Sequence, residues 1–90
     1  MKTQSVTIQC ENGLHLRVAS QVSKIAMQSG ASVHIRCAGC SNADACSALQ
    51  LLMLGATSGT RLEIEAEGSD ANETAVLHAL TQLFEHGGGI

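Results

Sequence analysis

The chain has 90 residues, enough for one small domain, and 44% hydrophobic with 14% charged residues is ordinary for a globular protein. A formal net charge of −3 and a single aromatic residue, Phe84, argue against a general nucleic-acid binder, which needs basic and stacking side chains. No apolar run is long enough to cross a bilayer, so we expect no membrane insertion. No charged-then-apolar secretion signal opens the sequence, so we expect a cytoplasmic protein whose four cysteines remain thiols.

The N-terminal third predicts a strand, a turn and a helix. Residues 5–10 alternate between polar and apolar side chains, which is the period of a half-buried strand. Asn12-Gly13 favours a turn. Apolar residues over 16–27 recur at the spacing of an amphipathic helix, which Gly30 is expected to end in a left-handed conformation. The apolar face is expected to contain Val18, Ala19, Val22, Ile25 and Ala26, with Met27 beside them.

The middle of the chain predicts two strands and a short helix. Residues 31–37 alternate again, and a tight turn then leads into a short strand from about Cys40 to Ala43. Residues 48–54 are almost all apolar, which indicates a short helix that is either buried or partly exposed for a partner. Asp44 or Ser47 is expected to cap it.

The C-terminal third predicts a strand and a longer helix. Residues 61–67 alternate, with Glu63, Glu65 and Glu67 on an outer face that Arg61 joins. Ser69 or Asp70 is expected to cap the helix, with Glu73 completing a capping box with Asp70. The inner stripe of this helix is expected to consist of Val76, Ala79, Leu80 and Leu83, flanked by Leu77 and Phe84.

The order of these elements is strand, helix, strand, strand, helix, strand, helix. Interleaved β-α-β crossovers in this order predict an α+β fold, an open-faced β-sandwich in which three helices cover one face of a four-stranded antiparallel sheet. No linker or repeat divides the sequence, so we expect a single domain over residues 1–90.

His15 and Arg17 flank Leu16 where the first helix is predicted to begin, and the first N–H groups of a helix have no intrahelical partner. The positive end of the helix dipole favours neutral imidazole, so His15 is a candidate nucleophile. A phosphoryl group on that ring would meet the amides of Leu16 and Arg17 and the guanidinium of Arg17. The alternative is that His15 only caps the helix, and the His-x-Arg spacing alone favours that alternative.

The segment 12–17, Asn-Gly-Leu-His-Leu-Arg, together with the order of the elements, resembles the histidine-containing phosphocarrier (HPr) family of the bacterial phosphoenolpyruvate-dependent phosphotransferase system. The resemblance continues through residues 44–47, 51–55, 59–60 and 64–68. It implies that His15 carries a phosphoryl group on Nδ1 and that Arg17 stabilises it. The implied donor is phosphorylated enzyme I and the implied acceptors are enzyme IIA domains. Such a carrier is a protein co-substrate, not a self-sufficient enzyme, and uses no cofactor.

Val18 departs from the family pattern, which usually has proline after the arginine. Proline suits the first helical turn because its missing N–H would be unpaired there. Valine keeps that donor and loosens the backbone, so we expect lower local rigidity with anion binding retained. Residues 51–54 and the glycine-ended tail resemble the nitrogen-related branch of the family more than the sugar-transport form.

Ser47 matches the position that HPr kinase/phosphorylase modifies in some bacteria, so regulatory phosphorylation and simple helix capping both fit it. Its neighbours depart from the kinase pattern, which favours capping. The helix over 48–54 cannot bury every side chain against one sheet face, and the resemblance implies partner docking on this helix and the first one. The expected docking residues are Leu49, Leu52 and Met53.

Cys37 and Cys40 have the spacing of half a zinc or redox site. A second pair is missing from the sequence, and His34, three residues before Cys37, is expected on the opposite face of a strand. We therefore expect no metal. The main hypothesis is a monomeric phosphocarrier; the alternatives are a regulatory module of the same fold that docks without carrying phosphate, and a metal or redox protein using Cys37 and Cys40.

Overall fold

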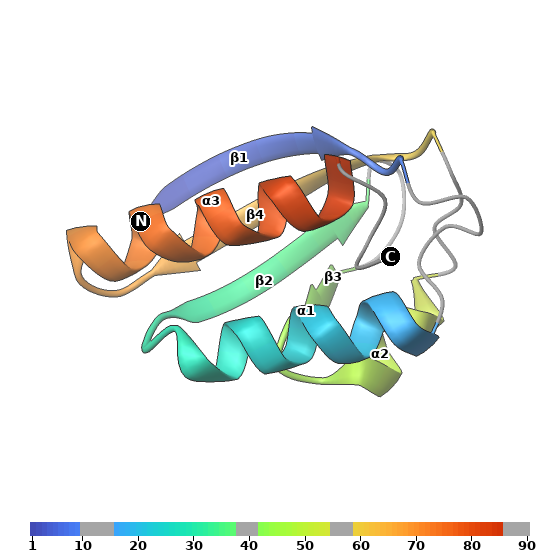
Figure 1. The fold of residues 1–90 in the computed structure, drawn as a ribbon, viewed down its shortest axis with the longest axis horizontal. Helices are drawn as coiled ribbons and strands as arrows, with labels where there is room; N and C mark the ends of the chain where they lie inside the picture. The colour runs from blue at the N-terminus through green and yellow to red at the C-terminus, as the bar shows by residue number, and fades with distance from the viewer. Residues whose placement is uncertain (10–15, 38–41, 55–58, 86–90) are drawn as a thin grey trace.

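Four strands and three helices make up the chain in the computed structural model, which describes residues 1–9, 16–37, 42–54 and 59–85. In chain order the elements are β1 (Lys2–Thr7), α1 (Leu16–Gln28), β2 (Ser32–Cys37), β3 (Asn42–Asp44), α2 (Ala48–Met53), β4 (Arg61–Glu67) and α3 (Asp70–Glu85). The sheet order is β1-β4-β2-β3 and every neighbouring pair is antiparallel. Figure 1 shows the helices as one layer in front of this sheet, so the predicted open-faced sandwich is confirmed.

The two central strands β2 and β4 show the predicted alternation. Val33, Ile35 and Cys37 of β2 face the helices, as do Leu62, Ile64 and Ala66 of β4, and all six are buried. Strand β1 lies at an edge of the sheet and begins three residues earlier than the alternation of residues 5–10 predicts. It is paired with β4 from Lys2 to Thr7, and its first residues are placed by this backbone pairing and not by burial, since only Val6 of the strand is buried.

Helix α1 lies across the helix-covered face with the predicted apolar side inward. Val18, Ala19, Val22 and Ala26 are buried, Ile25 is half-buried, and Met27 is exposed. The helix ends at Gln28, and Gly30 just after it has a φ of 75°, in the left-handed region that glycine adopts without steric cost. The end of α1 is therefore set by the local sequence, and the side of α1 that is buried is set by the 3.6-residue repeat of its apolar residues.

Helix α2 is short and is fixed chiefly at its N-terminus. Ser47 is the N-cap, with an extended backbone, and its Oγ accepts a hydrogen bond from the Gln50 N–H at 3.3 Å. Asp44, the other expected cap, instead belongs to β3 and accepts from the Cys46 N–H at 2.9 Å. Strand β3 runs one residue further than predicted, to Asp44, because its pairing with β2 continues to His34; the predicted start at Cys40 lies outside the described residues.

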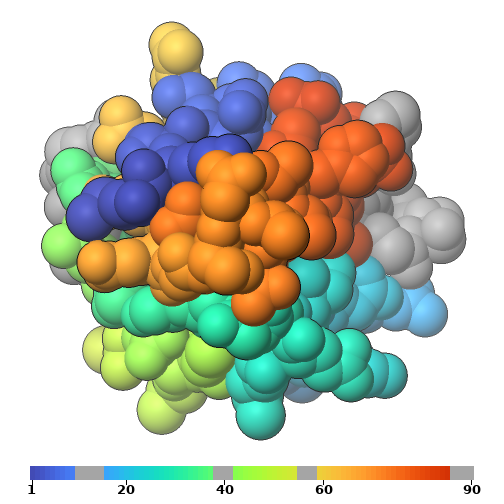
Figure 2. Space-filling view, turned by 90° about the vertical axis from the view of Figure 1, so that its left-hand side faces the viewer, coloured from blue at the N-terminus to red at the C-terminus, as the bar shows by residue number. Residues whose placement is uncertain are grey.

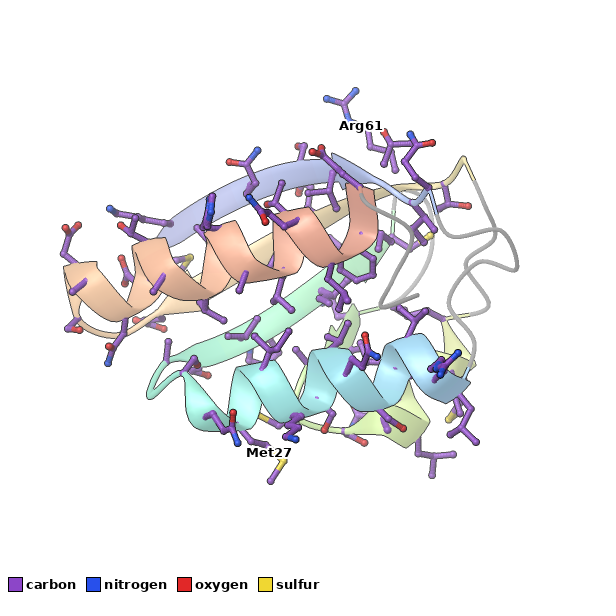
Figure 3. The ribbon with its side chains drawn as sticks, in the orientation of Figure 1. Met27 and Arg61 are labelled. Carbon is purple, nitrogen blue, oxygen red and sulfur yellow. The ribbon has the colours of Figure 1, made fainter. Side chains whose placement is uncertain are left out.

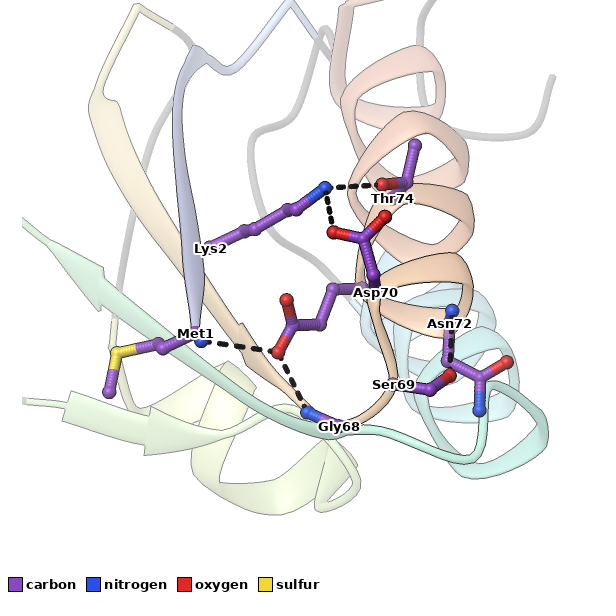
Figure 4. Close-up of polar contacts among 8 residues, drawn as sticks. Met1, Lys2, Gly68, Ser69, Asp70, Asn72 and Thr74 are labelled. Carbon is purple, nitrogen blue, oxygen red and sulfur yellow. Dashed lines mark hydrogen bonds and ion pairs between the residues drawn. The ribbon is translucent and has the colours of Figure 1, made fainter.

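The start of α3 is tied to the start of β1 by a cluster of polar contacts (Figure 4). Ser69 is the cap, and its Oγ accepts from the Asn72 N–H at 3.2 Å. Glu73 does not complete a capping box with Asp70, as the sequence predicts; its buried carboxylate accepts from the Gly68 N–H at 2.9 Å and lies 3.3 Å from the Met1 amino group. The helix begins at Asp70, one residue earlier than a cap at Asp70 requires, which moves Glu73 one position further along the helix.

Lys2 holds the same two elements together. Its Nζ lies 2.7 Å from Asp70 Oδ1 and donates to Thr74 Oγ1 at 2.7 Å. Figure 2, viewed from this end, shows the first residues of β1 in blue packed against the first turns of α3 in orange. The Lys2 ammonium lowers the pKa of Asp70, first by hydrogen bonding and then by its charge.

The buried face of α3 differs from the predicted stripe. Leu77 and Phe84, predicted as flanking residues, are buried with Val76 and Leu80, whereas Ala79 and Leu83 are only half-buried. Phe84 is completely inaccessible to solvent. The helix is rotated toward its larger side chains, because burying phenyl and isobutyl groups removes more apolar surface from water than burying alanine.

The cysteines do not all remain thiols. Cys37, buried at the end of β2, is disulfide-bonded, whereas Cys46 is a free, exposed thiol. The expectation of four thiols is therefore wrong for Cys37. That expectation came from the cellular compartment, which says nothing about which sulfur atoms lie within bonding distance.

Candidate functional site

The first turn of α1 contains the two described residues of the predicted phosphoryl site. Helix α1 begins at Leu16, the residue after His15 in the sequence; His15 itself lies outside the described residues. The Leu16 and Arg17 side chains are both exposed. Within the described part of the chain, Arg17 makes no hydrogen bond or ion pair, so its guanidinium remains available to an anion.

Val18 has a structural role that its departure from the family proline did not reveal. Its side chain is fully buried among the core residues of α1, directly below the two exposed residues of the first turn. It therefore anchors the first turn by apolar packing. Where the family usually has a proline that restricts the backbone of the first turn, this chain has a valine whose side chain packs in the core.

Helix α2 has one buried face and one exposed face. Leu51 is fully buried and Leu52 is half-buried against the core, whereas Leu49 and Met53 are exposed at 69% and 74%. The three leucines and the methionine of α2 cannot all reach one sheet face, so two of the three predicted docking side chains project into solvent. The third, Leu52, contributes to the core and to the edge of the exposed surface.

Helix α1 extends this exposed apolar surface in two places. Leu16 is 64% exposed and Met27 is 67% exposed, and Figure 3 shows the Met27 side chain extending away from the helix. A hollow of about 330 Å³ lies between α1 and the start of α2. It is lined by Ser20, Ser23, Lys24, Met27, Gln28 and Ala48.

We name the exposed apolar side chains of Leu16, Met27, Leu49 and Met53 the α1–α2 surface. The resemblance implied docking on both helices, but the docking residues that the sequence named all lie on α2. The signal for the rest was present: Leu16 and Met27 lie off the apolar stripe of α1, and a large apolar residue off the stripe is exposed unless a neighbouring element covers it.

Charge is distributed unevenly over the molecule. Helix α1 contains two cations, Arg17 and Lys24, and no acidic residue, and α2 contains no charged residue. The described carboxylates lie on β3, β4 and α3. The chain is acidic as a whole, yet the two helices that contain the α1–α2 surface have two cations and no carboxylate, so this side of the molecule attracts acidic surfaces and phosphate groups.

The open face of the sheet contains the remaining sequence candidates. Glu63 and Glu65 are joined by Arg36 of β2, whose Nη1 lies 3.8 Å from Glu63 and whose Nη2 contacts Glu65. Arg61, the predicted partner of these glutamates, extends away from the sheet (Figure 3). The register explains the difference, because Arg36 is directly opposite Glu63.

His34 lies on the open face, opposite to the buried Cys37, as predicted. Cys37 is disulfide-bonded and so offers no thiolate to a metal, while Cys40 lies outside the described residues. Within residues 1–9, 16–37, 42–54 and 59–85, no group of three or more His, Cys, Asp or Glu side chains is arranged to hold a metal ion. Among the described helices, none has the length and hydropathy of a membrane-spanning segment.

Comparisons with known proteins agree with the fold and with the order of the motifs. The family model described as the PTS HPr component phosphorylation site matches residues 2–86. The phosphocarrier protein HPr of Vibrio cholerae is 42% identical over 83 residues, which cover 92% of this chain and 95% of that protein.

Solved structures of the same kind are similar over nearly the full length. HPr-C-His from Thermoanaerobacter tengcongensis has a TM-score of 0.89 at 27% identity, and the match covers 100% of this chain and 98% of that one. A phosphocarrier protein HPr from Bacillus anthracis has a TM-score of 0.83 at 26% identity, covering 92% and 95%. The chain therefore belongs to the HPr family and is a phosphocarrier of the phosphotransferase system.

Proposed function

We propose that the phosphoryl group is carried on His15, that phosphorylated enzyme I donates it, and that enzyme IIA domains remove it. The observation that carries this proposal is the match of residues 2–86 to a phosphorylation-site family, with His15 in the segment that resembles the family motif. The start of α1 at Leu16 supports it, because the free N–H groups of a helix start suit an anion.

The transfer is a displacement at phosphorus. A lone pair on Nδ1 of neutral His15 forms a nitrogen–phosphorus bond while the bond between phosphorus and the donor's phosphorylated residue breaks. Arg17 stabilises the charge on the phosphoryl oxygens, and the amides of Leu16 and Arg17 donate to them. In the second transfer the same bond breaks and the imidazole is regenerated, so the carrier is returned unchanged.

The α1–α2 surface is the proposed docking site for both kinds of partner. Leu49 and Met53 supply apolar contact on α2, Leu16 supplies it beside the proposed phosphoryl site, and Leu52 supports the edge of the patch. Exposed apolar side chains gathered over two helices are typical of a protein–protein contact. Because Arg17 and Lys24 are the charged groups of α1, we infer that the partners present an acidic rim.

One incubation tests the site. The protein, enzyme I and labelled phosphoenolpyruvate should give an acid-labile, base-stable label on the wild type and none on His15→Ala. His34→Ala and His78→Ala are matched controls, since both histidines are exposed and neither lies on α1 or α2: His34 is on β2, on the open face of the sheet, and His78 is on α3. Both variants should be labelled fully. A persistent label on His15→Ala would refute the assignment of the site.

The same incubation separates the main alternative, a module that docks without carrying phosphate. That module would bind enzyme I or a IIA domain through the α1–α2 surface and remain unlabelled. Transfer from the labelled carrier to a sugar-specific or a nitrogen-related IIA domain identifies the branch of the family. We further propose that the protein is a monomer in the cytoplasm, which sedimentation and cell fractionation test.

Regulation at Ser47 is a separate proposal. Ser47 caps α2 through its side-chain oxygen, so a phosphate there would lie at the helix start, next to the α1–α2 surface, and would oppose docking of acidic partners. Incubation with HPr kinase/phosphorylase and ATP should give an acid-stable label on the wild type and none on Ser47→Ala. No label on the wild type would leave capping as the role of Ser47.

A further inference from the structure

Ser23 is the buried polar side chain of α1, 9% exposed, in a row that otherwise contains Val18, Ala19, Val22 and Ala26. Serine inside a helix commonly donates to the backbone carbonyl four residues earlier. Here the Ser23 hydroxyl donates to the Cys46 carbonyl oxygen at 2.7 Å, 23 residues away. Its Oγ also lies 3.7 Å from the Met27 sulfur, a weak acceptor, so the single hydroxyl proton is committed to Cys46.

The acceptor is placed where it controls α2. Cys46 immediately precedes the Ser47 cap. The other side-chain hydrogen bonds of this corner stay within it: Cys46 N–H to Asp44, Asp44 N–H to Gln50, and Gln50 N–H to Ser47. A backbone hydrogen bond from the Ala45 N–H to the Val33 carbonyl, at 3.0 Å, ties the corner to β2 but not to α1. In the described part of the chain, Ser23 therefore provides the one side-chain hydrogen bond that joins α1 to the start of α2.

A helix as short as α2 needs such an anchor. Six residues are too few to hold a helix in place by backbone hydrogen bonding alone, and only Leu51 of α2 is fully buried. Leu51, the half-buried Leu52 and the buried C-cap residue Leu54 fix the depth of α2, but such apolar contacts have no preferred direction and leave the helix some freedom to tilt or rotate. A second, directional contact at the helix start removes this freedom.

The freedom matters because the α1–α2 surface is divided between the two helices. Leu16 and Met27 come from α1, and Leu49 and Met53 come from α2. A partner whose surface fits all four side chains requires one relative placement of the two helices. If α2 is misplaced in part of the molecules, only the remaining fraction can bind, and the apparent affinity falls in proportion to that fraction. The hollow beside Ser23 leaves space for such movement.

We infer that Ser23 is a positioning residue, whose hydrogen bond to Cys46 holds α2 in the placement that phosphoryl donors and acceptors recognise. This inference rests on the proposed docking function of the α1–α2 surface. The residue touches neither the phosphoryl group nor, in this role, the partner. It acts on docking, and the transfer step after docking should be unaffected.

The test compares Ser23→Ala with Ser20→Ala, a matched control that removes a hydroxyl from an exposed position lining the same hollow. Initial rates of phosphoryl transfer from phosphorylated enzyme I are measured over a range of carrier concentrations. Ser23→Ala should raise KM about 2- to 10-fold, the factor that corresponds to one lost hydrogen bond, with kcat within about twofold. Ser20→Ala should leave both unchanged. An unchanged KM in Ser23→Ala overturns the inference.

Amide hydrogen exchange provides a readout that does not depend on phosphoryl transfer. In Ser23→Ala the amides of Leu51 and Leu54, which donate to Ser47 and Leu51 within α2, should exchange faster by a similar factor, while those of α3 keep their wild-type rates. Wild-type exchange throughout α2 contradicts the inference. Failure of the wild type to accept phosphate would remove the proposed function instead, and the exchange rates would still decide the role of Ser23.

Discussion

Leu51 and Leu49 offer a sharp test of which face of α2 belongs to the core. They are the same residue type in the same short helix, one fully buried and one 69% exposed. Leu51→Ala removes three buried carbon atoms and leaves a cavity, at a cost of about 2–5 kcal/mol. For a domain of this size each kcal/mol lowers Tm by about 4–8 °C, so the expected loss is about 10–20 °C for a cost near 2.5 kcal/mol.

Leu49→Ala should behave in the opposite way. Truncation of an exposed leucine changes the free energy of unfolding by less than about 0.5 kcal/mol, because little buried surface is lost. The same variant should raise KM for phosphoryl transfer, since it removes part of the α1–α2 surface. Thermal unfolding followed by circular dichroism at pH 7, with transfer kinetics well below Tm, separates the two effects. Equal loss of Tm in both variants would contradict the orientation of α2.

Three further predictions concern stability. Glu73→Gln should destabilise the protein more at pH 7 than at pH 3. The Gly68 N–H, and after it the Met1 amino group, lower the pKa of Glu73 below the ordinary carboxyl value of 4.5. The contribution of the Glu73 carboxylate to the free energy of unfolding is therefore present above pH 4.5 and is lost as the pH falls through the folded-state pKa. Urea unfolding at the two pH values measures the difference, and an equal effect at both would refute the assigned contact. Ser47→Ala should cost about 1 kcal/mol through the lost cap, measured by the same unfolding assay, and Ser47→Asn should recover most of it. Gly30→Ala should also cost about 1 kcal/mol, because φ is 75° and the added Cβ would lie 2.8 Å from the Asn72 amide nitrogen; an unchanged urea midpoint would show that the turn relaxes.

The strands and α1 could be predicted because their signals are local. Alternation with period two decided the inward faces of β2 and β4, and a 3.6-residue repeat decided the core side of α1. Gly30 could be predicted as a helix end because its conformation depends on its own lack of a side chain. These features depend on residues within a few positions of one another, where the chain itself fixes the geometry.

The candidate site was only partly predictable. The segment around His15 could be recognised from its order of residues, and the exposed positions Leu49 and Met53 followed from an excess of apolar side chains on α2. Leu16 and Met27 were missed, because exposure depends on what covers a helix from outside. Arg61 was expected beside the glutamates of β4, but Arg36 takes that place because β2 lies next to β4 in the sheet.

The sequence by itself determined the order of the elements, their inward faces in the sheet, and the family resemblance on which the proposal for His15 rests. Only the tertiary structure decided the rotation of α3 that buries Phe84, the core role of Val18, and the hydrogen bond from Ser23 to Cys46. Each of these joins segments far apart in the chain. Such contacts are set by the packing of whole elements against one another, which no local repeat specifies.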